Sequence, residues 1–385
     1  MRATRKARNR ADRAARRAAN RIARAERERR ADRTEAGSGA AACAAVAHTR
    51  GELRTLQDHA RADRQSTPVF NILAVAQAGR LEREAALLAA SLRRNAPGFR
   101  GRLIVAEPQP TGAWQGRDVR LTAAGRAALT DFGAEIVPLH AHAFGHSYPH
   151  GNKIEALALL PAGEPFLFLD SDTVITGPIG RLPLGSCPPT ASMRREGTWP
   201  DPPLYGPGYN AIWSALYDRF GLDLATSLDL SQPEDHWERY LYFNAGWFCG
   251  PDPAEFGRRF LTWATDLQRD PGEALAAQAL VPWLDQVILP LVIHSLGGGR
   301  PGPEFAGMDG AVAWHWRKLP LLYAAAPDSA VEVVEALACL SALQALMAGW
   351  PAWDRLVVGG DGRDLIRPRS TGPGCRHANR SSVRS

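Results

Sequence analysis

The chain has 385 residues, of which 45% are hydrophobic and 22% charged, an ordinary composition for a globular protein with one large α/β domain or two modest ones. Its net charge of +6 is concentrated in residues 1–35, where 14 basic and 5 acidic side chains give +9 and leave −3 for the rest. That body lacks the charge of a nucleic-acid binder, and no nucleic-acid partner is expected. No run of about 18 apolar residues occurs, so a transmembrane helix is not expected either.

The five cysteines are scattered along the chain and form no C-x-x-C pair. This spacing argues against a zinc site and against a disulfide framework, and it fits a reducing cytosol. The N-terminus is basic but is not followed by the apolar segment of a secretory signal. We therefore expect a cytoplasmic protein.

Residues 1–66 form a basic, Arg/Ala-rich extension. Its high helix propensity without an apolar stripe predicts a solvated, fraying helix or disorder, and residues 36–66 have the character of a linker. Charged runs of this kind are usually solvated and without a folded role. They also suit an electrostatic arm for anionic lipid or RNA. The sequence leaves both interpretations open. An electrostatic arm would allow residues 1–35 to make a weak contact with the inner face of a membrane, which would place the protein at the membrane periphery.

The folded body begins near residue 69 with alternating strands and helices. Strands are predicted at 71–76, 102–106 and 135–139, with helices at 81–95 and 121–132 between them. A β-α-β-α-β alternation calls for a parallel sheet. Neither a G-x-G-x-x-G motif nor a P-loop is present, so an NAD or P-loop nucleotide site has no support.

A helix at 153–160 leads into the most informative stretch, a buried strand at 166–169 followed by Asp170, Ser171 and Asp172. The two carboxylates fall at the carboxyl end of the strand, where open α/β sheets bind ligands. Side chains two residues apart on an extended backbone point the same way, so both can reach one Mg²⁺ or Mn²⁺ ion. A solvated turn or a helix cap is the alternative for an isolated D-x-D motif.

The second half of the body is predicted from similar signals. A Pro/Gly-rich loop at 177–209 carries Trp199, Tyr205 and Tyr209, which suit an acceptor wall and packing anchors equally well. The further predicted elements are a strand at 241–250, a helix at 254–267, a helix at 274–294 interrupted by prolines, a strand at 311–316 and an apolar helix at 331–347. We divide the chain into the extension 1–66, a domain 67–357 and a disordered tail 358–385.

Five pieces of the chain stand in a recognisable order: Lys153, Asp170-Ser171-Asp172, Phe243-Asn244-Ala245-Gly246, Asp285-Gln286 and His315. This ordered set resembles the GT-A glycosyltransferases, particularly the glycogenin and bacterial lipopolysaccharide galactosyltransferase-like group, over roughly residues 69–325. The resemblance implies a GT-A fold, with a mixed, mostly parallel sheet flanked by helices. It also implies a metal-dependent enzyme that moves a hexose from a nucleotide-sugar, a UDP-hexose, to a carbohydrate or lipid-linked acceptor.

The resemblance also implies a role for each matching residue. Asp170, Asp172 and His315 would hold Mn²⁺ or Mg²⁺ against the donor diphosphate, and Ser171 would bind the donor from the same turn. Lys153 would be a second phosphate partner, or else an ordinary surface lysine. Asn244 would contact acceptor hydroxyls or merely form a bulge, and Asp285 and Gln286 would lie beside the donor sugar, unless Asp285 only caps a helix. His294 is the alternative third ligand to His315, while His142 and His146 are expected to be loop residues rather than ligands.

Two other functions compete with the transferase. The segment 169–174 also fits the nucleophile motif of haloacid dehalogenase-like phosphatases, in which Asp170 would attack phosphorus. That nucleophile normally lies near the start of its domain, whereas about 100 residues of α/β structure precede Asp170. The third possibility is a non-catalytic nucleotide-sugar-binding domain on a transferase scaffold, since fold does not settle function.

Overall fold

The computed structural model describes residues 69–195 and 197–367. The predicted extension 1–66, with its arm and linker, lies outside the described residues, as does most of the predicted tail. The chain divides into two units, Met1–Ser66 and Thr67–Ser385. The second of these units contains everything that follows.

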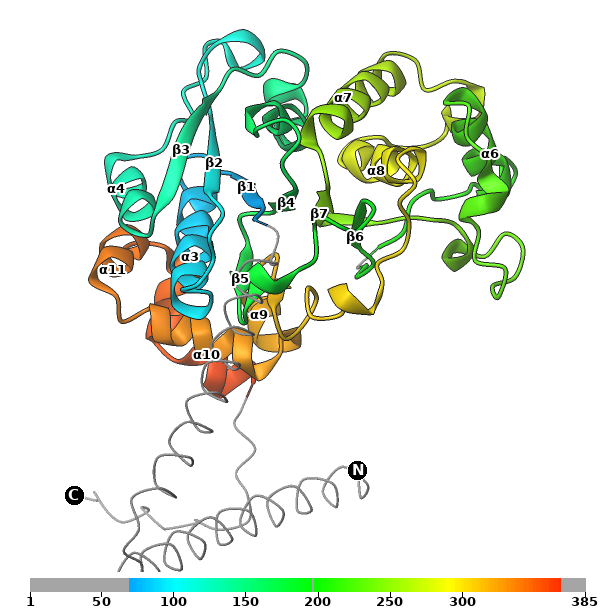
Figure 1. Ribbon diagram of the computed structural model, residues 1–385. Coiled ribbons are helices and arrows are strands. Elements are labelled where there is room, and N and C mark those ends of the chain that lie inside the picture. Colours follow the sequence, from blue (N-terminus) through cyan, green and yellow to red (C-terminus); the bar gives the residue numbers. More distant parts are fainter. Residues whose placement is uncertain (1–68, 196, 368–385) are drawn as a thin grey trace, which may run out of the picture. The chain divides into compact units, whose positions relative to one another are not determined.

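A six-stranded sheet of order β3-β2-β1-β4-β7-β6 organises the described chain (Figure 1). Its strands are β1 (Asn71–Val75), β2 (Leu103–Pro108), β3 (Ala134–Leu139), β4 (Phe166–Leu169), β6 (Thr190–Ser192) and β7 (Asn244–Gly250). β1 pairs in parallel with β2 and β4, and only β7 runs against its neighbours. This is the mixed α/β fold, mostly parallel and flanked by helices, that the resemblance to GT-A enzymes implies.

The strands at the centre of the sheet are apolar on both faces because both faces are covered by helices. In β4, Leu167 and Leu169 point into one core, and Phe166 and Phe168 point into the other. The first core is covered by α3 (Arg80–Asn95), α4 (Ala123–Asp131), α9 (Leu319–Ala325), α10 (Asp328–Leu337) and α11 (Ser341–Met347). The second is covered by α5 (Asn152–Glu155), α7 (Pro253–Arg269) and α8 (Leu284–Ser295).

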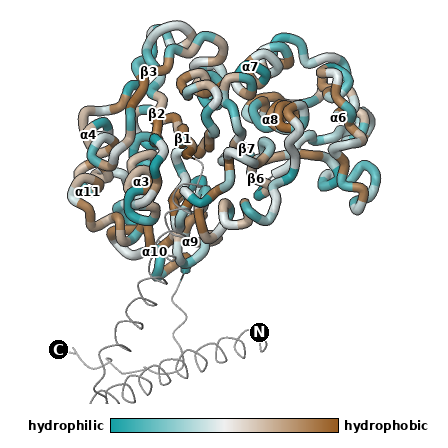
Figure 2. Tube along the Cα trace, in the orientation of Figure 1, coloured by the Kyte–Doolittle hydropathy of each residue, from teal (hydrophilic) through white to brown (hydrophobic). Residues whose placement is uncertain are grey.

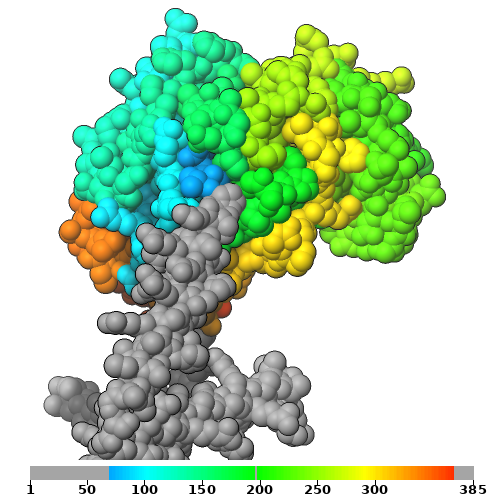
Figure 3. Space-filling view, in the orientation of Figure 1, coloured from blue at the N-terminus to red at the C-terminus, as the bar shows by residue number. Residues whose placement is uncertain are grey.

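Hydropathy along the chain follows this layering. In Figure 2, α8 and the inner strands β1 and β2 are mostly brown, whereas the outer helix α7 carries teal positions. Helix α7 is amphipathic and begins at Pro253, with the side chain of Asp252 accepting the amide of Ala254 as an N-cap. In Figure 3, the segment of β1–β3 (blue to cyan-green) and the segment from α6 (Tyr209–Arg219) to α8 (green to yellow) lie on different sides of the view.

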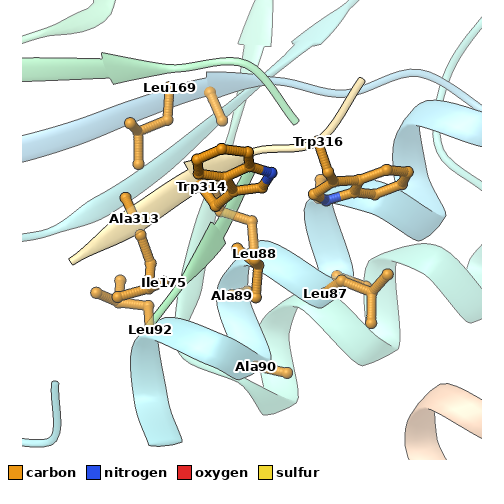
Figure 4. Packing of buried hydrophobic residues seen from close by; sticks show 14 of the residues in the cluster. Leu87, Leu88, Ala89, Ala90, Leu92, Leu169, Ile175, Ala313, Trp314 and Trp316 are labelled. Atoms are coloured by element: carbon orange, nitrogen blue, oxygen red, sulfur yellow. The ribbon is translucent and has the colours of Figure 1, made fainter. Parts of the chain in front are cut away.

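A small second sheet joins the first core beside α3. Strand β5 (Thr173–Ile175) pairs antiparallel with β8 (Ala313–His315), so that Thr173 lies opposite His315. Figure 4 shows the rings of Trp314 and Trp316 packed among Leu87 and Leu88 of α3. This packing matters for the site because it brings the late strand β8 next to the turn that follows β4.

Short elements complete the described chain. They are the helices α6 (Tyr209–Arg219) and α12 (Pro351–Trp353), the π-helical turns Asp354–Val358 and Gly362–Ile366, and 3-10 turns at Gly112–Trp114, Gly145–Ser147, Pro149–Gly151, Ala156–Leu159, Ile179–Arg181, Leu224–Ser227, Trp237–Arg239, Glu273–Leu275 and Pro303–Phe305.

Several predicted elements differ from the structure. The loop predicted at 177–209 contains strand β6, and the helix predicted at 153–160 is α-helical only as α5 and continues as a 3-10 turn. The helix at 331–347 is two helices, α10 and α11, because the chain is extended at Leu340. The helix at 274–294 is helical only as α8 and the 3-10 turn at Glu273–Leu275, and residues 276–283 between them are irregular. The disordered tail expected from 358 is wrong for residues 358–367, since Ile366 packs against the first core and Arg363 pairs with Glu335.

Among the described residues, no single helix combines the length and the apolar character needed to cross a membrane. Helices α10 and α11 meet that criterion only when they are taken together, and they are bent by 92° relative to one another.

Candidate active site

The carboxyl edge of the sheet, where β1 and β4 end, opens into a pocket of about 290 Å³. Its wall combines apolar side chains, among them Val75, Leu81 and Phe168, with the charged groups Arg80, Lys153, Asp170 and Asp172. This is the place at which α/β sheets bind ligands, because strand ends and helix N-termini meet there. The mixture of an apolar wall and charged groups suits a ligand with a flat ring and an anionic part.

Asp170, Asp172 and His315 form the one group of potential metal ligands found in the part of the chain that the structure describes. One ligand atom from each lies within 4.8 Å of the others. The Nε2 atom of His315 lies 3.0 Å from Oδ1 of Asp172 and 3.8 Å from Oδ2 of Asp170. Burial would raise the pKa of Asp172, but the adjacent His315 outweighs it and lowers this pKa. The two aspartates and the late histidine, about 145 residues apart, are thus side by side.

Gly246 allows His315 to approach the carboxylates. A side-chain Cβ at position 246 would collide with Nδ1 of His315, so the residue opposite the histidine must be a glycine. The carbonyl of Gly246 accepts the amide of Asp170 at 2.8 Å, which extends the β4–β7 pairing to the first aspartate. Asn244 accepts the amide of Gly246 at 2.9 Å and lies at a register shift opposite Ser192. The side-chain oxygen of Asn244 therefore supports the local turn and bulge.

Lys153 is buried between two carboxylates. Its ammonium lies 2.9 Å from Oδ1 of Asp170 and 3.1 Å from Oδ2 of Asp285, and it donates to the carbonyl of Ala245 at 3.2 Å. Burial would lower the pKa of this ammonium, but the two carboxylates outweigh it and raise the pKa above its ordinary value of 10.5. The interpretation of Lys153 as an ordinary surface lysine is wrong, since only 8% of its side chain is exposed.

Asp285 is fixed from both sides. Tyr148 donates its hydroxyl to Oδ1 of Asp285 at 2.8 Å and accepts the backbone amide of Asp285 at 2.9 Å. Burial and the neighbouring Asp285 raise the pKa of Tyr148, so its hydroxyl keeps its proton. The next residue, Gln286, accepts the hydroxyl of Tyr242 at 3.2 Å and remains half-buried. Asp285 is the second residue of helix α8, and it faces Lys153 rather than serving only as a cap.

Arg80 and Glu84, which sequence reasoning missed, support the turn of the two aspartates from α3. Arg80 lies 2.8 Å from Oε1 of Glu84, and the Ser171 hydroxyl donates to Oε2 of Glu84 at 3.2 Å. Ser171 is buried and directed at Glu84. A signal was present, because Glu84 lies one position from the apolar stripe of Leu81, Ala85 and Leu88, where a charge needs a specific partner.

Negative charge exceeds positive charge in this cluster. Four carboxylates, those of Glu84, Asp170, Asp172 and Asp285, face the two cations Lys153 and Arg80. Burial, and after it the charge of Asp172, raises the pKa of Glu84 to about 8.

The other sequence candidates lie elsewhere. The Nε2 atom of His294 is 3.0 Å from the hydroxyl of Thr226, and its ring packs on Tyr217 rather than on the carboxylates. Trp199 is buried edge-on against Trp213, whereas the side chain of Tyr205 is 94% exposed. Those two aromatic residues do not share one environment. His142 and His146 belong to no metal-ligand group among the described residues.

Comparison with known proteins identifies a family model that matches this chain. The model of the Rhodobacterales glycosyltransferase domain matches residues 72–297. None of the curated proteins matches the chain.

Among solved structures, the galactosyltransferase LgtC in complex with donor and acceptor sugar analogs is 16% identical, with 60% of this chain and 73% of that chain covered and a TM-score of 0.34. The glycosyltransferase GlyE of Streptococcus pneumoniae TIGR4 is 12% identical, with 63% of this chain and 48% of that chain covered and a TM-score of 0.32.

Proposed function

Since the chain belongs to the Rhodobacterales glycosyltransferase domain family, we propose that it is a metal-dependent transferase. It moves a hexose from a nucleotide-sugar, a UDP-hexose, to a carbohydrate or lipid-linked acceptor. The observation that supports this most is the convergence of Asp170, Asp172 and His315 at the rim of the pocket. Residues 67–357 are its catalytic domain.

The residues at the rim fit a hard divalent cation such as Mn²⁺ or Mg²⁺. Two carboxylates and one imidazole are ligands that Mn²⁺ accepts readily. The excess of carboxylates over the cations Lys153 and Arg80 is a second argument, because a metal cation on Asp170 and Asp172 would compensate it. When bound, such a cation supplies Lewis-acid stabilisation for the negative charge that develops on a diphosphate leaving group.

The protein's own residues hold the reacting groups in place. Lys153 pairs with Asp170 and with one oxygen of Asp285, and Tyr148 fixes the other oxygen of Asp285. Asp285 and Gln286 then face the donor sugar, and Asn244 borders the acceptor. A rigid, partly desolvated arrangement of this kind favours transfer because its dipoles need no reorganisation during the reaction. Whether the configuration at the anomeric carbon is retained depends on which groups flank it.

The competing functions have less support. Family membership points to a glycosyltransferase and leaves the phosphatase without a supporting observation. The same membership argues against a binding domain that has lost catalysis, as does the complete set of two aspartates and a histidine. For the location we propose the cytoplasm, supported by the free cysteines Cys187, Cys249 and Cys339 among the described residues.

The test uses Asp170→Ala and Asp172→Ala in the full chain, assayed with a panel of nucleotide-sugars and Mn²⁺. We expect each variant to lose about 10²–10³-fold in donor hydrolysis and transfer, the usual cost of removing one group that stabilises developing charge. Mn²⁺ should also raise the melting temperature of the wild type but not of the variants. Asp118→Ala, at an exposed ion pair with Arg120, is the matched control. Undiminished turnover in both site variants would refute the proposal.

A further inference from the structure

Arg80 occupies the first position of the first helix after β1. The turn from β1 into α3 ends at Gly79, whose φ of 90° suits glycine, and its amide is capped by Glu82 at 3.0 Å. The side chain of Arg80 therefore starts at the carboxyl edge of the sheet. It lines the same pocket as Lys153 and the two aspartates.

Glu84 fixes the direction of the Arg80 guanidinium. It lies one helical turn after Arg80, is fully buried, and accepts from Nη1 of Arg80 with Oε1 at 2.8 Å. Its second oxygen, Oε2, accepts the Ser171 hydroxyl. One buried carboxyl group thus joins the start of α3 to the turn of Asp170 and Asp172.

The outer part of Arg80 remains available to a ligand. Its side chain is 54% exposed and approaches Oδ2 of Asp172 at 4.0 Å. The protein contacts of the guanidinium all use Nη1, which donates to Glu84 and, at 3.3 Å, to the carbonyl of Arg317. Neither Nε nor Nη2 has a hydrogen-bond partner among the described residues. A guanidinium carries five N–H groups in a fork that fits phosphate oxygens.

Lys153, by contrast, has no N–H group free to donate to a phosphate. An ammonium group has three donors, and those of Lys153 face Asp170, Asp285 and the carbonyl of Ala245. Its side chain is also only 8% exposed. A phosphate could reach Lys153 only by displacing the partly buried Asp170 or the buried Asp285 from a formed ion pair, which is costly.

We propose that Arg80, positioned by Glu84, is the diphosphate-binding cation of this pocket and binds a nucleoside diphosphate even without a divalent cation. This rests on the proposed transferase function, which supplies the diphosphate as part of the donor. Glu84 is a positioning residue in this assignment. Lys153 holds the carboxylates in place and does not contact the phosphates.

The experiment is calorimetric titration of the full chain in EDTA with inorganic pyrophosphate, UDP and uridine. Arg80→Gln should weaken pyrophosphate and UDP binding about 10- to 100-fold, the range of a lost hydrogen bond to a charged group, and leave uridine unchanged. The affinity of Arg80→Lys for pyrophosphate and UDP should lie between those of the wild type and Arg80→Gln, because lysine keeps the positive charge but not the forked N–H groups of the guanidinium. Arg102→Gln, at a half-exposed ion pair remote from the pocket, is the matched control.

Glu84→Gln tests the positioning role with the same three ligands. It should weaken pyrophosphate and UDP binding less than Arg80→Gln does and leave uridine binding unchanged. In the double variant Arg80→Gln/Glu84→Gln, diphosphate binding should be no weaker than in Arg80→Gln alone. Wild-type affinity for pyrophosphate in Arg80→Gln would overturn the proposal, as would a wild type that binds no diphosphate in EDTA. These binding results are separate from the Asp170 and Asp172 turnover assays, so the two proposals can fail independently.

Discussion

Two groups of buried carboxylates lie at the same edge of the central sheet and differ in how they are compensated. Glu107, near the end of β2, accepts the amide of Leu121 at 2.9 Å, a guanidinium N–H of Arg126 at 2.5 Å and the amide of Gln109 at 3.0 Å. These donors outweigh the effect of burial and lower the pKa of Glu107. The group at the end of β4 instead has more carboxylates than lysine and arginine cations, and burial together with the charge of Asp172 raises the pKa of Glu84.

The difference shows that position at a strand end does not make a functional site. Glu107 is satisfied by the protein itself and contributes to folding, since buried polar groups with full partners stabilise a unique structure. In the group after β4, Asp170 pairs with Lys153 and Asp172 with His315, but the carboxylates still outnumber the lysine and arginine cations, and this excess supports a metal cation as a further partner. The comparison predicts which variants affect stability, which affect ligand binding, and which affect both.

Lys153→Met should have the largest effect. The change leaves Asp170 and Asp285 without their shared cation, which costs about 3–5 kcal/mol when one partner of a buried ion pair is removed. Urea unfolding of the metal-free protein measures this loss. Lys318→Met, at an exposed lysine, should stay within about 0.5 kcal/mol. A Lys153→Met protein as stable as the wild type would show that the β4 group does not depend on this cation.

Gly246→Ala should have an intermediate effect, confined to the β4 group. The added methyl group collides with the His315 ring and costs about 1–3 kcal/mol as overpacking. It should also displace the imidazole from the aspartates, so that Mn²⁺ no longer raises the melting temperature as it does in the wild type. Gly98→Ala, whose Cβ meets no atom within 4 Å, is the control. An unchanged response to Mn²⁺ would exclude His315 as a ligand.

Glu107→Gln should have the smallest effect and should alter stability alone. At pH 7 we expect a loss of about 1 kcal/mol, the typical net value of a hydrogen bond, with turnover unchanged. Because folding lowers the pKa of Glu107 below its ordinary 4.5, its stabilisation is present above pH 4.5 and disappears as the pH falls through the lowered pKa. The difference between variant and wild type in urea unfolding should therefore shrink in acid. Glu332→Gln, at an exposed carboxylate, should show neither change.

The layers of the fold could be predicted from the sequence because the signals are local. The apolar runs of β1, β2 and β4 and the periodicity of α3 each lie within one short segment. Helix boundaries late in the chain were less predictable. Because α10 and α11 pack against the same core, the apolar pattern of the sequence continues across the break at Leu340 and does not mark the end of the first helix.

The site was only partly predictable for a physical reason. The order of motifs indicated Asp170, Asp172 and His315, and the structure brings their ligand atoms together. Arg80 and Glu84 were missed because their role depends on how α3 packs against the turn after β4, which is a tertiary property. Lys153 was noticed, but the saturation of its three donors follows from burial, which no spacing of residues reveals.

The position of Lys153 also has an evolutionary consequence. A single ammonium is shared by Asp170, which belongs to the proposed cation site, and by Asp285, which belongs to the proposed sugar site. If either aspartate is replaced by a neutral residue, the charge of the lysine is only partly compensated. If the lysine is lost, both aspartates lose the cation that they share. Positions 153, 170 and 285 are therefore expected to vary as one unit among relatives. A lineage that changes its donor sugar by altering position 285 would have to re-adapt its metal site in the same step.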